Sequence, residues 1–202
     1  MSTITLNYFD LPARAEPIRL ALAMGGLEFE DKRLSFPEFG ASSFKHLPVL
    51  QMGGADYTQS IALLRYAGKH AGLVPSNALA ALKVDEIVMM AEDCNIAMFT
   101  TMSEEDKNKQ MDLRQALASG KLKDMLKGLA AKLTANSSSS YFVGESLTIA
   151  DLIVHTVVGT VESGFLEGLP ATLVSDVAPS LKEHQGVVLK HPKVRAYYAS
   201  KA

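Results

Sequence analysis

The sequence is poor in cysteine, with Cys94 as the only one among 202 residues. A single cysteine excludes an intrachain disulfide, a CxxC redox pair and a zinc ribbon, and its acidic and apolar neighbours indicate a core thiol. Long apolar runs are missing too: the best, Ile149–Val161, contains Asp151 and His155 and is shorter than the ~20 residues that span a bilayer. Met1–Tyr8 lacks the basic flank and apolar run of a signal peptide. We therefore expect a soluble protein of a reducing compartment, the cytoplasm.

Neither sign of charge dominates, because 20 Lys and Arg stand against 22 Asp and Glu, a formal net charge of −2. This balance excludes the long-range positive field of a dedicated nucleic-acid binder, although not a local basic pocket. Hydrophobic residues make up 48% and charged residues 21%, as in globular proteins. A chain of this length can bury a core without a disulfide or structural metal, as one large domain or two small ones.

The first 75 residues mix strand and helix patterns. Alternating apolar residues predict a strand at Thr3–Tyr8 and a second one at Leu27–Leu34. Between them, Pro12 opens a helix that stops at Gly25 and Gly26. The remaining elements are an irregular stretch over 35–43 with at most one helical turn, two short strands around the hairpin dipeptide Gly53-Gly54, and a helix over 60–70 that starts at a good cap residue, Ser60. The predicted order is β-α-β-(α)-β-β-α.

From residue 76 onward the pattern is helical. Thr148 as N-cap and Asp151 three positions later form a variant of the capping box, and Leu147 and Leu152 stand where a hydrophobic staple belongs. Long helical segments are expected over 79–102 and 107–135, a polar loop over 136–140, and short helices after Pro179 and Pro192. The sequence thus predicts an α/β domain over 1–75 and an all-α domain over 76–202.

Four segments in register along the whole chain together resemble the cytosolic glutathione transferases. They are YFDLPARAEPIR at 8–19, HLPVL at 46–50, QSIALLRY at 59–66 and the capping box at 148–151. The first segment is most similar to the sigma class of the tyrosine-type enzymes, with its Tyr-Phe pair and Arg-Ala-Glu run. The resemblance implies a thioredoxin-like glutathione-binding domain with a cis-proline over 1–75. It also implies that the helical domain over 76–202 lines a site for the electrophile.

Glutathione chemistry requires a stabilised thiolate, because a thiol with a pKa near ~8.5 is mostly protonated at neutral pH and the thiolate is the nucleophile. By resemblance, Tyr8 donates a hydrogen bond to that thiolate, and Arg14 adds positive potential at a helix start that also favours anions. Taken alone, Tyr8 could be a half-buried strand tyrosine, and Arg14 a surface arginine paired with Glu16 or Asp10. The absence of Cys and Ser from positions 11–14 speaks against the serine-type and cysteine-type classes and against glutaredoxin-like chemistry.

The resemblance assigns further glutathione contacts to His46, Leu47, Pro48, Gln59 and Ser60. A cis peptide before Pro48 would leave the Leu47 backbone to pair with the cysteinyl part, and His46 would border the glycyl carboxylate. Gln59 and Ser60 start a helix whose N-terminus suits the γ-glutamyl carboxylate. The structural alternatives are a trans edge-strand proline, an ordinary loop histidine, and a serine that only caps its own helix.

Two assignments concern a partner subunit, because the resemblance also implies a homodimer. Asp93 of one subunit would reach the γ-glutamyl ammonium held by the other, and Phe44 would insert into the partner as an aromatic key. Without the resemblance, Asp93 is a solvated helix carboxylate and Phe44 an internal contact. The electrophile pocket is expected to include Phe9, Ala13, Met98 and Met102, although methionines at helical spacing are more often packing residues.

The chain departs from the sigma pattern at Phe36 and Gly40, where a Trp and a Lys that touch glutathione would be expected. One residue is also deleted between Gly40 and Pro48. We expect weaker binding of the glycyl end, or use of His46 or Lys45 instead.

The prostaglandin-isomerising members carry three acidic residues linked to a divalent metal, and Met89 replaces the first of them here. We therefore predict no metal site and no prosthetic group, with glutathione as co-substrate. The predicted function is conjugation of the glutathione thiolate to small apolar electrophiles, a detoxifying reaction without nucleic-acid or membrane partners. Two alternatives stay open: a specialised glutathione-dependent isomerase or peroxidase, and a non-enzymatic crystallin-like or ligand-carrying relative.

Overall fold

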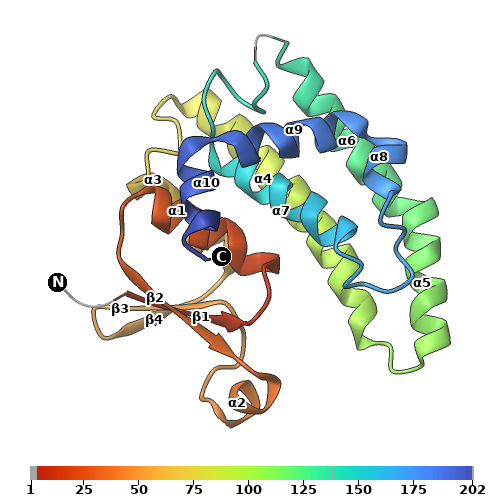
Figure 1. The fold of residues 1–202 in the computed structure, drawn as a ribbon, viewed down its shortest axis with the longest axis horizontal. Coiled ribbons are helices and arrows are strands. Elements are labelled where there is room, and N and C mark those ends of the chain that lie inside the picture. Colours follow the sequence, from red (N-terminus) through yellow and green to blue (C-terminus); the bar gives the residue numbers. More distant parts are fainter. Residues whose placement is uncertain (1–3, 138, 202) are drawn as a thin grey trace. The chain divides into compact units, whose positions relative to one another are not determined.

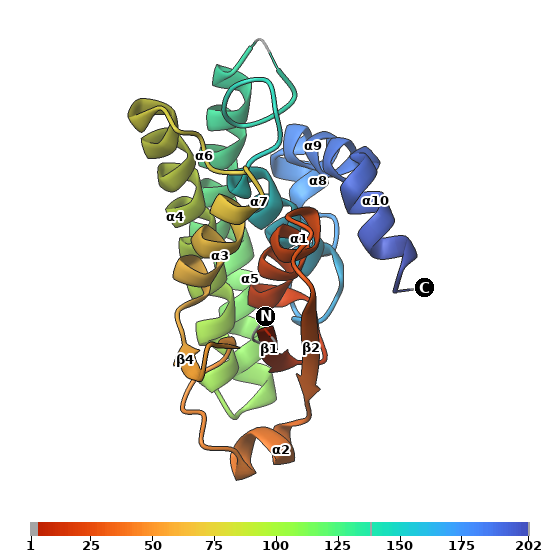
Figure 2. The same cartoon turned by 90° about the vertical axis from the view of Figure 1, so that its left-hand side faces the viewer.

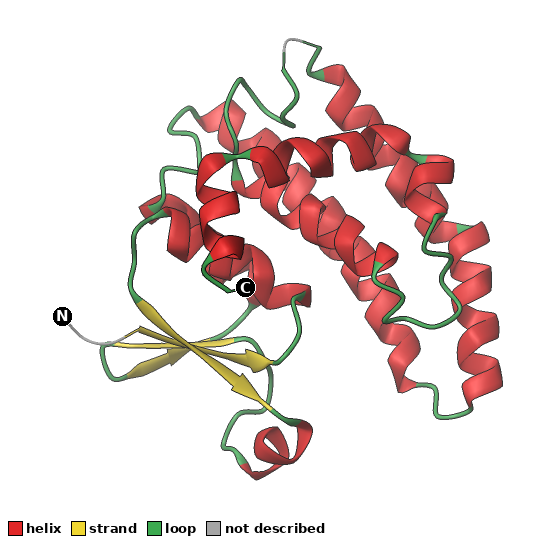
Figure 3. Cartoon of the chain, in the orientation of Figure 1, coloured by secondary structure: helices red, strands yellow, loops and turns green. Residues whose placement is uncertain are grey.

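The computed structural model describes residues 4–137 and 139–201 (Figure 1). Thr3 of the predicted first strand and Ser138 of the predicted polar loop lie outside the described residues. The chain divides into two compact units, one formed by residues up to Val74 together with those from Pro192 onward, the other by Pro75–His191. The described strands all fall in the first unit, and the second is helical (Figure 3). The predicted fold class, a thioredoxin-like α/β domain followed by an all-α domain, is confirmed.

A four-stranded mixed sheet with the order β2-β1-β3-β4 forms the centre of the first unit. β1 and β2 run parallel, whereas β3 is antiparallel to both β1 and β4. The central position of β1 explains why its residues Leu6 and Asn7 have no exposed surface. The strands are β1 (Ile4–Phe9), β2 (Phe29–Leu34), β3 (Val49–Met52) and β4 (Ala55–Tyr57).

The connections follow the predicted turns with one shift at the first helix. A parallel pair needs a crossover, which here begins as a 3-10 turn, η1 (Ala13–Ala15), and continues as α1 (Glu16–Met24). The helix proper therefore begins four residues after the expected Pro12. The predicted hairpin joins β3 to β4 at Gly53 and Gly54, whose φ angles of 61° and 80° suit a type I′ turn.

Three more helices complete the first unit. α3 (Ser60–His70) packs against α1 on one face of the sheet, and α2 (Phe36–Ala41) lies beyond the other (Figure 1). α2 is longer than the single turn expected there, because Ser35 and Glu38 form a capping box at its start. α10 (Pro192–Ala199) packs against α1, where Lys193 Nζ donates to the Met24 carbonyl at 2.8 Å. The terminal helix thus belongs to the sheet unit, which differs from the expected division at residue 76.

The helical unit is organised around α7, which is buried along nearly its whole length and packs against α4 and α9. α4 and α6 run side by side (Figure 2). No helix within 4–137 and 139–201 is both long and apolar enough to cross a bilayer. The elements are α4 (Ala78–Thr100), η2 (Thr101–Ser103), α5 (Lys107–Ser119), α6 (Lys121–Ala135), α7 (Ile149–Glu162), α8 (Leu173–Val177) and α9 (Pro179–Lys190).

The continuous helical segment expected over 107–135 is wrong, because Gly120 divides it into α5 and α6. Its φ of −120° and ψ of −108° are not helical, and a Cβ there would approach the Ala116 carbonyl oxygen to 3.2 Å. Glycine fits this close approach, and glycine is also the poorest helix former after proline.

The predicted capping box at the start of α7 is confirmed, and its carboxylate has more partners than a cap needs. Asp151 Oδ2 accepts hydrogen bonds from the Thr148 backbone N–H at 2.7 Å and the Thr148 hydroxyl at 2.9 Å. Asp151 Oδ1 accepts the Phe142 N–H and lies 2.9 Å from His184 Nε2. Since Asp151 has no exposed surface, this one group joins the loop before α7 to α9 inside the core.

Replacing this carboxylate should destabilise the helical unit strongly. We expect Asp151→Ala to lower the free energy of unfolding by about 3 kcal/mol or more, because buried donors on Thr148 and Phe142 lose a charged acceptor. Urea unfolding followed by circular dichroism measures the change. The control is Asp176→Ala, which removes an exposed acid on α8 that accepts from the hydroxyl of Thr172, the residue before that helix. This variant should cost under about 1 kcal/mol. Equal losses in the two variants would contradict the role assigned to Asp151.

Burial, with a smaller contribution from nearby His184, lowers the pKa of His155 in α7 from 6.5 to about 4. As the pH falls below 6.5, His155 binds a proton in the unfolded chain but stays neutral in the folded one. The free energy of unfolding therefore decreases between pH 6.5 and about 4. We expect the wild type to lose about 2 kcal/mol more than His155→Leu between pH 7 and pH 5. Urea midpoints at both pH values test this, with the exposed His70→Gln as control. An identical pH dependence in wild type and His155→Leu would refute it.

Candidate active site

The strand register brings the first group of predicted residues to one end of the sheet. Asn7 of β1 lies opposite Val49 of β3, and Leu50 of β3 lies opposite Tyr57 of β4. The end of β1, the start of β3 and the end of β4 therefore lie at the same end of the sheet. Tyr8, Pro48 and Gln59, which are distant in sequence, stand in these strands or within two residues of their ends.

Tyr8 occupies the next-to-last position of β1 and is 6% exposed. Its ring makes an edge contact with Phe9, with centroids 5.7 Å apart, and the guanidinium carbon of Arg19 lies 5.8 Å from its centroid. The side chain is therefore more enclosed than the half-buried strand tyrosine considered from the sequence. A phenol fixed in this way can present its hydroxyl to an anion with little further loss of side-chain entropy.

Arg14 lies half-buried in η1, directly after β1 and its short turn. The two carboxylates considered as its alternative partners bind other arginines. Glu16 accepts from Arg19 at 3.2 Å, and Asp10 accepts from Arg33 at 2.6 Å. Both carboxylates thus take part in ion pairs with other arginines of the first unit.

The peptide bond between Leu47 and Pro48 is cis, as the resemblance implied. Pro48 is buried, Leu47 is half-buried and His46 is exposed. β3 pairing begins at Val49, so Leu47 precedes the ladder. The three residues therefore lead into β3 at the end of the sheet where β1 stops.

Gln59 has a φ of 74° and a ψ of 100°, a left-handed backbone that is rare for a residue other than glycine. It occupies the N-cap position of α3, and Ser60 is the first helical residue, so the expectation that Ser60 caps its own helix is wrong. Gln59 makes no side-chain cap hydrogen bond. The start of α3 thus resembles helix N-termini that bind anions through their first N–H groups. The unusual backbone conformation of Gln59 is a second indication, because such conformations are frequent at functional sites.

An aromatic cluster covers the end of β1. The Phe9 ring lies 4.7 Å from that of Phe36 and 5.4 Å from that of Phe39, both on α2. Phe36 is nevertheless 66% exposed, and a Cβ at Gly40 would meet nothing within 4 Å. The segment that departs from the sigma pattern therefore forms a capped helix that supplies an aromatic surface.

The predicted residues of the helical unit differ in accessibility. Asp93 is exposed on α4, Met98 is fully buried and Met102 is 43% exposed. Cys94 is buried, and that burial, together with the charge of Asp93, raises the pKa of its thiol to about 12. Cys94 is thus a core residue as expected. In the first unit, Phe44 is half-buried and Ala13 is 6% exposed, with a left-handed φ of 34°.

The charged network under the β1–α1 connection was missed in the sequence. Arg19 has no exposed surface and binds Asp31 of β2 at 2.8 Å as well as Glu16. Burial acts to raise the pKa of Asp31, but hydrogen bonds from Arg19 and Arg33 lower it below its usual value. A cation among the apolar residues 18–24 of α1 is the signal that could have revealed the network.

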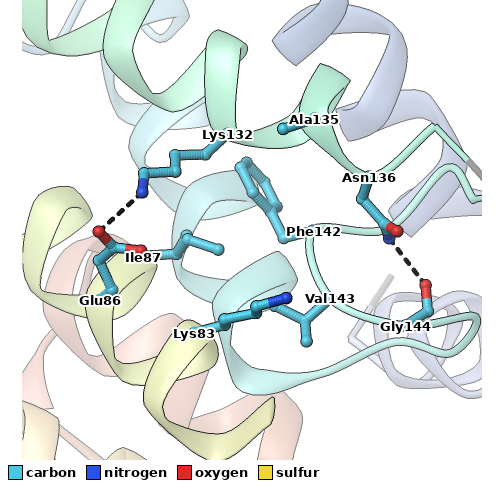
Figure 4. Close-up of a pocket in the computed structure, with 9 residues that line it drawn as sticks. All are labelled: Lys83, Glu86, Ile87, Lys132, Ala135, Asn136, Phe142, Val143 and Gly144. Carbon is cyan, nitrogen blue, oxygen red and sulfur yellow. Dashed lines mark hydrogen bonds and ion pairs between the residues drawn. The ribbon is translucent and has the colours of Figure 1, made fainter. Parts of the chain in front are cut away.

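A separate pocket of about 210 Å³ lies in the helical unit and includes none of the predicted site residues (Figure 4). Ile87 and Phe142 form apolar walls, and Lys132 on its rim binds Glu86 at 2.7 Å. In the part of the chain that is described, no three His, Cys, Asp or Glu side chains gather closely enough to hold a metal ion.

Two family models match the chain. The glutathione S-transferase N-terminal domain matches residues 4–69, and the C-terminal domain of the same family matches residues 92–201. Among curated proteins, glutathione S-transferase 1 of Ascaris suum is 31% identical over 83% of this chain and 86% of its own length. Glutathione S-transferase 4 of Caenorhabditis elegans is 28% identical over 100% of this chain and 98% of its own.

Solved structures agree on the fold. A prostaglandin synthase D of Nilaparvata lugens superimposes with a TM-score of 0.86 at 22% identity, covering 99% of this chain and 98% of that one. The glutathione S-transferase of Ascaris lumbricoides has a TM-score of 0.77 at 27% identity, with the same coverage. The relatives span nematode and other classes, so they do not single out the sigma class. Together, the two domain models and the relatives show that the chain is a transferase of the glutathione S-transferase family.

Proposed function

We propose that this chain joins the thiolate of glutathione to electrophilic centres of apolar compounds and releases the product as a thioether. The observation that carries the proposal is the convergence of Tyr8, the cis Leu47–Pro48 bond and the strained Gln59 at one end of the sheet. These positions combine a phenol, the backbone that precedes β3 and a helix N-terminus, which match the thiol, the peptide backbone and the carboxylate of glutathione.

Tyr8 and Arg14 have the chemical roles in this mechanism. The thiol loses its proton to solvent, and the Tyr8 hydroxyl donates a hydrogen bond to the resulting sulfur anion while staying protonated itself. Arg14 adds positive charge near the same sulfur, and each unit of depression in the pKa of the thiol corresponds to about 1.4 kcal/mol. The sulfur lone pair then forms the new S–C bond, and the electrophile takes up the electron pair or expels a leaving group.

The remaining contacts bind glutathione rather than activate it. We assign the Leu47 backbone beside Pro48 to the cysteinyl part, and exposed His46 to the glycyl carboxylate. The α3 N-terminus at Gln59 and Ser60 takes the γ-glutamyl carboxylate, because helix N-termini present free N–H groups and favour negative charge. For the electrophile side we keep the candidates that the resemblance implies, Phe9, Ala13, Met98 and Met102. Of these, Phe9 is half-buried and Met102 is 43% exposed, whereas Ala13 and Met98 are buried.

The sigma-like, tyrosine-type assignment remains part of this proposal. Its support is the Tyr8-Phe9 pair followed by Arg14-Ala15-Glu16. Phe36 and Gly40 lack the indole and ammonium expected of that class, so glycyl-end binding here depends on His46 or Lys45.

A homodimer is proposed from an apolar stripe on α4. Leu82, Met89 and Ile96 recur every seven residues, which places them on one helix face, and each is at least half exposed. Asp93 is exposed one turn beyond Met89, beside this stripe. A second copy covering the stripe would remove these side chains from water and bring Asp93 close to the partner. Phe44, half-buried before β3, is the proposed aromatic key of the same dimer.

Removing the Tyr8 hydroxyl should separate binding from chemistry. We expect Tyr8→Phe to bind glutathione with nearly unchanged affinity in calorimetry. Its kcat/KM toward a general aromatic electrophile should fall by about 100-fold, and the pKa of the bound thiol should rise by about two units, because a donor to the anion is lost. The control is Tyr66→Phe, whose hydroxyl instead contacts Met52 Sδ at 2.9 Å on the same unit. If the wild type binds no glutathione at millimolar concentration, the proposed conjugating function is contradicted and the carrier or structural alternative is favoured.

Charge on the α4 stripe should disrupt the dimer. We expect the double variant Leu82→Lys/Met89→Lys to sediment as a monomer at concentrations where the wild type is dimeric, since apolar burial is replaced by repelling ammonium groups. Its glutathione affinity should fall about tenfold, as in the dimeric Asp93→Asn, because both lose the carboxylate supplied across the interface. Leu189→Lys, at a position that is 42% exposed on α9, is the control. A monomeric wild type, or an unchanged dimer in the double variant, contradicts this interface.

A further inference from the structure

Arg19 is the most deeply buried charge of the first unit, and its guanidinium is directed at backbone as well as at carboxylates. Nε donates to Asp31 at 2.8 Å, and Nη1 donates to Glu16 at 3.2 Å. A buried cation needs such partners, since an unpaired one loses its hydration without compensation. Two carboxylates would suffice for charge, yet the side chain makes further bonds.

The further bonds all go to the connection between β1 and α1. Nη1 donates to the Leu11 carbonyl at 2.9 Å and to that of Pro12 at 3.5 Å, and Nη2 donates to the Phe9 carbonyl at 3.4 Å. One planar group thus holds the backbone directly after Tyr8 and directly before Ala13. The geometry exploits the rigid fork of arginine, which a lysine ammonium cannot reproduce.

The held segment contains a strained residue. Ala13 has a φ of 34°, a left-handed conformation that is unfavourable for an alanine and persists only where neighbouring contacts enforce it. Arg19 bonds the two carbonyls that precede Ala13, and the Glu16 N–H bonds the Pro12 carbonyl from the helix side at 3.1 Å. The turn before α1 is therefore held in an unfavourable conformation by hydrogen bonds from Arg19 and from the Glu16 N–H.

We propose that Arg19 is the positioning residue of the reaction: it fixes the turn that joins Tyr8 to Arg14 and thereby sets where the phenol and the guanidinium stand relative to the thiolate. The inference rests on the proposed function. Arg19 lies under the turn and does not touch the reacting atoms. Its effect is transmitted through the Phe9, Leu11 and Pro12 carbonyls and through the Tyr8 ring, whose centroid lies 5.8 Å from its Cζ.

The deciding comparison is Arg19→Lys against Asp31→Asn. Lysine keeps the charge but cannot bond three carbonyls and two carboxylates from one plane. We expect a fall in kcat/KM of about tenfold near neutral pH, a rise of about one unit in the pKa of bound glutathione, and recovery of the rate at higher pH. Asp31→Asn weakens the ion pair but leaves the carbonyl contacts, so the melting temperature should fall while the pH profile stays that of wild type.

Hydrogen exchange provides a readout that does not depend on activity. The Leu11 N–H, which donates to the Phe9 carbonyl at 2.8 Å within the turn, should exchange at least tenfold faster in Arg19→Lys and near the wild-type rate in Asp31→Asn. If Arg19→Lys does not fold, the same comparison is made in chains that also carry Ala13→Gly. Glycine adopts the left-handed φ without strain, so the turn then depends less on Arg19 for folding. An Arg19→Lys variant with a lower melting temperature but wild-type pH profile and exchange overturns the proposal. A wild type without glutathione activity overturns the proposed function instead, and exchange then decides the positioning role alone.

Discussion

The first unit depends on a guanidinium that has no exposed surface. A charge in that position is stable only when every donor meets an acceptor, so the elements around Arg19 have little freedom to move apart. Asp31 ties it to β2, Glu16 ties it to the start of α1, and three carbonyls tie it to the end of β1 and the turn before α1. The parallel β1–β2 pair and its crossover are thus held by one polar centre in addition to the apolar core.

The helical unit contains a comparable buried polar centre, in which the side chain is a carboxylic acid instead of a guanidinium. Asp151 is a fully buried carboxylate that accepts from the Thr148 and Phe142 backbone and lies against His184. In both units a buried polar side chain bonds backbone groups in the segment that leads into a helix. Arg19 and Asp151 therefore fix the path by which the chain enters α1 and α7. Apolar packing fixes such a path poorly, because it is non-directional.

Local sequence patterns were sufficient to predict the elements that depend on turn residues, helix caps and hydrophobic periodicity. The Gly53-Gly54 hairpin, the capping box at Thr148 and the helical character of the second half could all be predicted. The break at Gly120 was missed because a lone glycine in a strongly helical pattern is usually tolerated. The exact start of α1 and the left-handed Gln59 were missed for a different reason: no residue pattern in the local sequence marks either of them. The cis Leu47–Pro48 bond came from the family resemblance, since no local rule distinguishes it from a trans edge proline.

The residues with chemical roles lie where regular structure stops. Tyr8 is at the end of a strand, Pro48 precedes one, and Gln59 separates β4 from α3. Such positions leave backbone groups unpaired and available to a ligand, but they lack the hydrogen-bond ladders that keep strands and helices in place. Two of the linking residues, Ala13 and Gln59, are even in strained conformations. Precise geometry at these ends must therefore come from side chains beneath them, which is why a buried residue such as Arg19 matters to the chemistry without taking part in it.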